Sequence, residues 1–163
     1  MELIEVTLAD KALISELSAV ATAIVRDYYD PLLGKAQNDY MLEKFQSEHA
    51  IAEQLAEGYR YYLVRDEGRD AGFMGFYPKP GSMYLSKLYL DRDSRGRGLG
   101  RRMLDFVVSQ ARAENLPAVT LNVNKYNDTV QFYEAMGFRR VRSEKNDIGS
   151  GYYMDDYVYQ LDL

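Results

Sequence analysis

The residues best suited to chemistry form a turn rich in glycine and arginine, Arg95-Gly96-Arg97-Gly98-Leu99-Gly100. An apolar run precedes this turn, and an amphipathic segment with helical spacing follows it. Glycines let the main chain approach a ligand with its N–H groups turned inward, and the start of a helix carries partial positive charge. Residues 92–102 contain five arginines against one aspartate. The combination predicts a phosphate site, and a flexible turn with solvated arginines is the alternative.

Two common phosphate-binding patterns do not fit this turn. A P-loop needs G-x-x-x-x-G-K followed by Ser or Thr, and the chain contains no such string. A dinucleotide-binding fingerprint needs G-x-G-x-x-G and an acidic residue about 20 positions later, where this chain has Asn122 and Asn124. The pattern that does fit is R-x-x-G-x-G, placed directly after the apolar residues Leu88, Tyr89 and Leu90.

A second block covers residues 127–138 and reads Asn-Asp-Thr-Val-Gln-Phe-Tyr-Glu-Ala-Met-Gly-Phe. Together with the turn, it resembles the GNAT superfamily of acetyl-CoA-dependent N-acetyltransferases. Val130 stands where alanine is commoner in that family, which should affect packing more than activity. The motif-specific resemblance covers residues 85–138, and the first 57 residues match only in the expected order of elements.

The resemblance implies a role for each position that matches the family's motifs. The main chain of Leu88, Tyr89 and Leu90 would pair with the pantetheine arm of acetyl-CoA, and Asn127 would hydrogen-bond that arm or simply cap a helix. Tyr133 would protonate the departing CoA thiolate. Acetyl-CoA is then the cosubstrate, and no metal is expected. Main-chain N–H groups would hold the pyrophosphate along Arg95, Gly96, Arg97, Gly98, Leu99, Gly100 and Arg101.

The base that would deprotonate the acceptor amine is less well defined. A primary ammonium has a pKa near 10.4, so it must lose a proton before it can attack the thioester. Many relatives carry a glutamate at the position of Ser86 in this chain. The remaining candidates are a chain of bound water or one of three carboxylates, Asp147, Asp155 and Asp156.

Composition removes several other kinds of chemistry. The 163-residue chain has no cysteine and one histidine, His49, which excludes disulfides and thiolate nucleophiles and disfavours a histidine metal site or a Ser-His-Asp triad. No apolar run reaches the ~20 residues of a membrane span, and the N-terminus lacks a signal-peptide layout. We therefore expect a cytoplasmic protein with no membrane partner.

Charge is unevenly distributed along the chain. Residues 1–57 carry 11 acidic and 4 basic side chains, residues 58–143 carry 9 and 15, and residues 144–163 carry 5 and 1. A basic middle between acidic flanks favours a polyanionic donor and a cationic acceptor. Because the basic residues concentrate in one turn of an acidic chain, a phosphate pocket is favoured and nucleic-acid binding is not expected.

Apolar periodicity and turn residues predict the elements that must position these groups. We expect a single GNAT domain over residues 1–163, of class α/β (α+β), with a mixed central sheet of about seven strands that splays between strands 4 and 5 and is flanked by helices. Pro31 and Gly34 should end the first helix, and Gly137 should cap the last one. Strands are expected at 2–6, 59–64, 72–77, 83–90, 118–123, 138–142 and 153–161, and helices at 13–25, 40–45, 49–55, 99–114 and 127–136.

The function expected from this reading is direct acetyl transfer from acetyl-CoA to a primary amine, with a polyamine or another cationic small molecule as the favoured acceptor. A loose similarity of Asp147-Ile148-Gly149 and Met154-Asp155-Asp156 to polyamine acetyltransferases points the same way. An amino acid, an aminoglycoside or a protein N-terminus stays open as the acceptor, and the protein is expected to be a monomer or homodimer. The alternative of another class is a non-catalytic acyl-CoA-binding regulatory domain.

Overall fold

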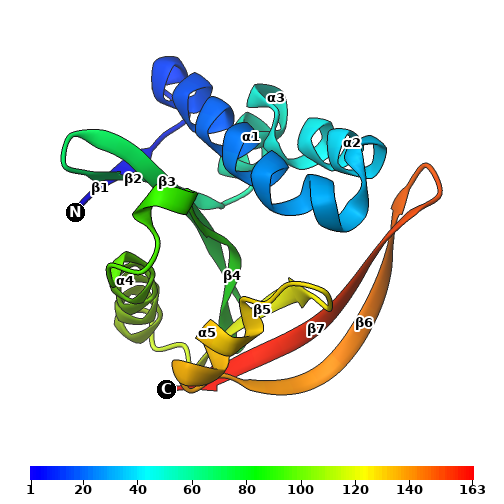
Figure 1. Ribbon diagram of the computed structural model, residues 1–163. Coiled ribbons are helices and arrows are strands. Elements are labelled where there is room, and N and C mark those ends of the chain that lie inside the picture. Colours follow the sequence, from blue (N-terminus) through cyan, green and yellow to red (C-terminus); the bar gives the residue numbers. More distant parts are fainter. The chain divides into compact units, whose positions relative to one another are not determined.

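The computed structural model describes residues 1–163, and its elements follow the predicted order (Figure 1). The strands are β1 (Glu2–Val6), β2 (Arg60–Asp66), β3 (Arg69–Lys79), β4 (Ser82–Leu90), β5 (Ala118–Asn124), β6 (Arg139–Gly149) and β7 (Tyr152–Asp162). The helices are α1 (Lys11–Leu33), α2 (Lys35–Gln46), α3 (Glu48–Ala56), α4 (Leu99–Ala113), α5 (Val130–Ala135) and a short 3₁₀ helix, η1 (Arg92–Ser94).

The strands form one seven-stranded sheet in the order β1-β2-β3-β4-β5-β7-β6. β4 runs parallel to β5, whereas β7 is antiparallel to both β5 and β6. The pairing between β4 and β5 joins Met83 to Val119 and Tyr84 to Thr120, although both strands continue beyond these positions. The mixed α/β architecture and the splay between strands 4 and 5 are confirmed.

The chain divides into two compact units. Unit 1 contains Met1–Tyr77 and Lys87–Met103, and unit 2 contains Pro78–Ser86 and Leu104–Leu163. β4 and α4 contribute residues to each unit. The expectation of one domain over the whole chain stays a prediction.

The core of unit 1 lies between α1 and the first three strands. Ile14, Leu17, Ala21 and Ile24 follow helical spacing and are buried, as the periodicity predicts. Their partners on the strands include Val6, Tyr61, Leu63 and Phe73, and Figure 1 shows α1, α2 and α3 grouped together. The amphipathic pattern of the first helix is therefore explained by burial.

Pro31 does not end the first helix, which corrects the prediction. α1 continues to Leu33 and ends at Gly34, whose φ of 83° lies in the left-handed region. A proline this close to a helix end removes one backbone hydrogen bond, while the N–H of Gly34 still donates to the carbonyl of Asp30 at 3.0 Å. The glycine therefore sets the boundary.

Two elements of unit 2 differ in length from the prediction. β6 extends to Gly149, because this strand at the sheet edge pairs through its main chain with β7 while its side chains stay largely exposed and polar. α5 begins only at Val130, because Asn127 Oδ1 accepts a hydrogen bond from the N–H of Thr129 at 2.9 Å and forms a turn first. Gly137 has a φ of 96°, in the left-handed region expected for a helix cap.

β5 separates an apolar face of unit 2 from a polar one. Val119, Leu121 and Val123 are buried, and they alternate with three polar residues on the other face, Thr120, Asn122 and Asn124. α5 lies on the apolar side, where the Tyr159 hydroxyl donates to Glu134 at 2.8 Å. None of the helices combines the length and the apolar character that crossing a membrane requires.

Core packing in unit 1 can be tested with two leucines of α1. Leu17 is fully buried and Leu32 is 38% exposed. We expect Leu17→Ala to lower the free energy of unfolding by about 2–5 kcal/mol, because it leaves a cavity that its neighbours fill only in part. Leu32→Ala, the control in the same helix, should cost less than about 1 kcal/mol. Urea denaturation followed by circular dichroism measures both, and equal losses would contradict the assignment of the core.

Candidate functional site

The glycine-rich turn is held between the end of β4 and the start of α4. Asp91 Oδ1 accepts a hydrogen bond from the N–H of Ser94 at 2.9 Å, which caps η1, and the Asp91 N–H donates to the carbonyl of Ala71 at 2.8 Å. Gly96 and Gly98 have φ values of 78° and 79°, and a Cβ at either position would meet no atom within 4 Å. Glycine is therefore favoured there by backbone conformation and not by lack of space.

The first turn of α4 presents N–H groups that the helix cannot use. The first helical bond there runs from the N–H of Arg102 to the carbonyl of Gly98, at 3.3 Å. The N–H groups of residues 99–101 lie ahead of it, where an α-helix offers no carbonyl partner. Leu99 is 4% exposed, so its side chain anchors this helix start in the core. The arrangement suits an anion that accepts several main-chain hydrogen bonds.

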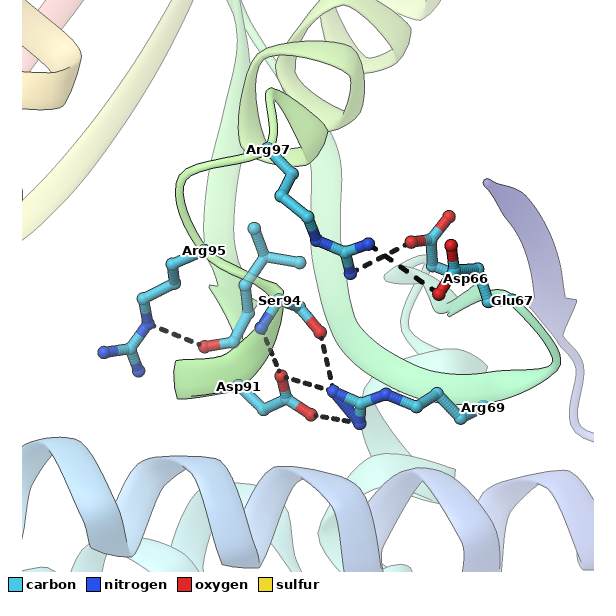
Figure 2. A network of polar contacts seen from close by, with 8 residues as sticks. Asp66, Glu67, Arg69, Asp91, Ser94, Arg95 and Arg97 are labelled. Carbon is cyan, nitrogen blue, oxygen red and sulfur yellow. Dashed lines mark hydrogen bonds and ion pairs between the residues drawn. The ribbon is translucent and has the colours of Figure 1, made fainter.

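Most arginines around the turn have acidic or carbonyl partners, as Figure 2 shows for Arg69, Arg95 and Arg97. Arg69 bridges Asp91, at 3.0 Å, and the hydroxyl of Ser94, at 3.1 Å. Arg97 pairs with Asp66 at 3.0 Å. Arg92 pairs in the same way with a carboxylate of α1, Asp27, at 2.8 Å.

These pairs reduce the positive field that the sequence predicted for the turn. The arginine partners are carboxylates of unit 1, so part of the local charge is balanced by neighbouring acids. Arg101 and Arg102 are exposed at the start of α4. Arg95 has a carbonyl and a ring as partners and no acid, so attraction for a polyanion rests on main-chain N–H groups together with these three side chains.

Just before the turn, successive residues of β4 point their backbone N–H and C=O groups to opposite edges of the strand. The carbonyl of Tyr89 faces Gly72 of β3 so closely that a Cβ on Gly72 would lie 2.1 Å from it. Because alternate residues of a strand point their polar groups to opposite edges, those of Leu88 and Leu90 face away from β3. The carbonyl of Leu90 accepts a hydrogen bond from Arg95 Nε at 3.2 Å. A polar edge of β4 is thus directed away from β3.

A cluster of aromatic side chains connects α1 with the end of β4. The hydroxyls of Tyr29 and Tyr89 are 3.0 Å apart, and the Tyr89 ring also packs against Phe73 and Tyr28. The guanidinium of Arg95 lies 4.3 Å from the centre of the Tyr28 ring. This packing orients the side chain of Arg95 at the first position of the turn.

Asn127 and Tyr133 both lie in unit 2, at the start and in the middle of the second motif. Asn127 is 4% exposed, and its Oδ1 accepts from the N–H of Thr129 in a turn ahead of α5, whose N-cap residue is Thr129 itself. Tyr133 is 8% exposed, with its ring 5.2 Å from that of Phe132 and 5.5 Å from that of Phe138. The turn residues, by contrast, belong to unit 1.

The three carboxylates considered as bases have different environments. Asp147 is exposed near the end of β6, where it accepts from the N–H of Gly149 at 2.8 Å. Asp155 pairs with Lys125 Nζ at 2.9 Å. Asp156 is 2% exposed, and burial raises its pKa. Of these three carboxylates, only that of Asp156 is buried.

The structure also identifies groups that sequence analysis did not select. Lys87 is half-buried on β4, with its ammonium 5.7 Å from the ring centre of Tyr59 and 5.9 Å from that of Tyr61, and burial lowers its pKa to about 8. The sequence feature that could have pointed to Lys87 is its position within an otherwise apolar strand. Glu144 receives hydrogen bonds from Asn122 and Arg142, which lower its pKa. His49 is exposed and pairs with Glu53 of α3.

Comparisons with known proteins find similar chains among the N-acetyltransferases. The Peptidyl-lysine N-acetyltransferase YjaB of Salmonella typhimurium is 29% identical over 128 residues, which cover 76% of this chain and 82% of YjaB. The PaiA N-acetyltransferase of Thermoplasma acidophilum, solved with coenzyme A, has a TM-score of 0.79 at 15% identity, with complete coverage of both chains. A GCN5-related N-acetyltransferase of Rhodopseudomonas palustris has a TM-score of 0.80 at 17% identity, covering 99% and 95%.

The family assignment rests on a match to most of the chain. The model of the family described as "Acetyltransferase (GNAT) domain" matches residues 30–153, which include the glycine-rich turn and the block at 127–138. The resemblance drawn from the motifs is thereby confirmed. The chain belongs to the GNAT acetyltransferase family, and it is an acetyl-CoA-dependent acetyltransferase.

Proposed function

We propose that this enzyme transfers acetyl from acetyl-CoA to a primary amine on a cationic acceptor. The observation that carries the donor half is the glycine-rich turn at the start of α4, with main-chain N–H groups that the helix leaves without carbonyl partners. The pyrophosphate of acetyl-CoA accepts hydrogen bonds there, from the N–H groups of residues 96–101, since the N–H of Arg95 donates to the carbonyl of Arg92 at 3.5 Å. The pantetheine arm pairs with the main chain of Leu88–Leu90, whose polar groups at Leu88 and Leu90 face away from β3.

The proposed reaction needs no covalent enzyme intermediate. The neutral amine nitrogen attacks the thioester carbon, the new C–N bond forms, and the C–S bond breaks. The amine gives up one proton, and the departing thiolate of CoA takes one. Tyr133 donates the proton to sulfur through its hydroxyl, and Asn127 hydrogen-bonds the pantetheine.

The acceptor is proposed from charge and from the comparisons together. The acidic flanks, with a net charge of −7 over residues 1–57 and −4 over residues 144–163, favour a cation. A polyamine meets this requirement, and so does a lysine side chain, the group in the name of the relative YjaB. Both present a primary ammonium on an alkyl chain. We expect the enzyme to act in the cytoplasm, as a monomer or homodimer.

The donor site is tested by Gly98→Asp, with Gly98→Asn as the control. Both side chains tolerate a positive φ better than most, and both find open space, but only Asp adds negative charge where the pyrophosphate binds. We expect Gly98→Asp to weaken CoA binding about tenfold or more, and Gly98→Asn to weaken it much less. Calorimetry with CoA measures both dissociation constants. Equal affinities in folded Gly98→Asp and wild-type protein would remove the turn from the donor site.

The proton donor is tested by Tyr133→Phe, which keeps the packed ring and removes only the hydroxyl. We expect kcat to fall about tenfold or more, since general acids contribute roughly 10²- to 10⁴-fold, while the affinity for CoA changes little. Tyr126→Phe is the control, because Tyr126 is 72% exposed. Steady-state thiol release measures both variants. Full activity of Tyr133→Phe would show that the thiolate leaves without help from this residue.

The acceptor is tested by a thiol-release assay with a panel of amines: spermidine, Nα-acetyl-lysine methylamide, neutral amino acids and an aminoglycoside. We expect turnover of the cationic acceptors, with kcat/KM for spermidine falling as salt rises, because a Debye length of about 10 Å at 0.1 M screens exposed charges. A neutral amino acid should show a smaller dependence on salt. Turnover of neutral or anionic amines alone would reject the cationic acceptor, and acetyl-CoA binding without turnover of any amine would favour the non-catalytic alternative.

A further inference from the structure

Unit 2 contains a pocket of about 360 Å³ on the polar face of β5. Ligand pockets in proteins span about 300–1,000 Å³, so this one lies at the small end of that range and can hold a group the size of a side chain. Its wall comes from the β3–β4 turn region, β4, β5, β6 and β7, and consists of Lys79, Ser82, Tyr84, Thr120, Asn122, Arg142, Glu144, Asn146 and Val158.

A hydrogen-bonded chain runs through the wall of the pocket and ends on two carboxylates. The Tyr84 hydroxyl donates to Asn122 Oδ1 at 3.0 Å. Asn122 Nδ2 then donates to Glu144 Oε2 at 3.2 Å and to Asp156 Oδ2 at 3.4 Å. Asn146 Nδ2 adds a second donor to Glu144 Oε2 at 3.3 Å. One amide therefore holds two acidic side chains beside the pocket.

The placement of the two acids is unfavourable for stability alone. Glu144 and Asp156 are directly opposite each other in the β6–β7 register, and like charges at such positions repel. Asp156 is also 2% exposed, with its carboxylate directed at Asn122 in the pocket wall. Its Oδ1 has no hydrogen-bond partner, and a buried carboxylate oxygen is costly when unpaired. A cation bound beside Glu144 in the pocket would reduce the repulsion between the two acids.

Each cationic side chain of the wall already has a contact within the wall, Arg142 with one oxygen of Glu144 and Lys79 with an aromatic ring. Arg142 Nε donates to the second oxygen of Glu144, Oε1, at 2.8 Å. Lys79 Nζ lies 3.9 Å from the centre of the Tyr84 ring, so the same wall already shows an aromatic face that holds an ammonium group. Neither contact reaches Asp156 Oδ1.

From these contacts we infer that the pocket binds the primary alkylammonium group of the acceptor, with Glu144 as the carboxylate in its wall and Asp156 as the buried charge that sets its affinity. This inference rests on the proposed function and names the part of the chain that recognises the acceptor. The shared ligand chemistry is an ammonium on a short alkyl chain, which a lysine side chain and a polyamine both supply. Burial raises the pKa of Asp156, and an ammonium beside it favours the ionised form.

Binding is tested first without catalysis, on wild-type protein. Butylamine, which is protonated at neutral pH, is titrated while the side-chain amide signals of Asn122 and Asn146 are followed by NMR. We expect saturable shifts of both signals with butylammonium and no saturable shift with 1-butanol, its neutral counterpart. Absence of saturable shifts, or equal shifts with the two ligands, would overturn the inference.

Two variants then test the acidic groups. Asp156→Asn and Glu144→Gln keep the size of each side chain and remove its charge, so each should raise the dissociation constant for butylammonium and the KM for the acceptor about tenfold, with affinity for CoA unchanged. Asp162→Asn is the matched control on β7, since Asp162 is exposed and pairs with Arg139, and it should stay within about twofold. Circular dichroism checks folding. An unchanged KM in both folded variants would reject the assignment.

Two further outcomes separate this inference from the proposed function. If butylammonium shifts the pocket signals but no amine is acetylated, the pocket stands and the proposed function fails. If amines are acetylated while the pocket signals do not move, the function stands and the pocket assignment fails. Titration with spermidine and with Nα-acetyl-lysine methylamide then identifies the source of the ammonium, since the tighter ligand is the one whose chain the pocket accommodates.

Discussion

An α-helix cannot provide carbonyl partners for its own first N–H groups, and the donor half of this enzyme follows from that constraint at α4. Gly96 and Gly98 adopt positive φ, so the chain can turn sharply from β4 into the helix. Leu99 is buried and holds the first residue in place. Around this start, Arg69 and Asp91 brace η1. The arginines near the turn therefore contribute to its rigidity as well as to its charge.

Unit 2 carries acidic groups, whereas the turn in unit 1 carries basic ones. Its polar face collects carboxylates and amides from β5, β6 and β7, and Asn122 connects them. The donor-binding groups that we propose in unit 1 are main-chain N–H groups beside arginines, whereas unit 2 buries the charge of Asp156 beside a small pocket. A polyanionic donor and a cationic acceptor can thus be bound by different residues, so that changes to one group leave the affinity for the other ligand unaffected.

The fold and the donor motif could be predicted because each depends on local signals. The glycines at 96, 98 and 137 predict positive φ at their own positions, and the apolar spacing of α1 predicts which of its residues are buried. Other features depend on partners distant in sequence. The part of β6 beyond Arg142 lacks the apolar alternation of a strand, and it is one because its main chain pairs with β7. The engagement of Arg97 by Asp66 and the burial of Asp156 arise from strands brought together by the fold, which the spacing of residues along one chain does not reveal.

The β6–β7 hairpin also has a consequence for the order of folding. Ser150 and Gly151 have φ values of 54° and 79°, as a tight hairpin turn requires, and the two strands pair from this turn outward with two shifts of register. Such local pairing forms in roughly 1–10 μs, whereas the parallel pairing of Met83 with Val119 must first close a long loop. We therefore expect Glu144 and Asp156 to face each other early, before Tyr84 and Asn122 arrive. The amide of Asn122, which donates to both acids in the folded protein, then reaches them only after the hairpin has formed.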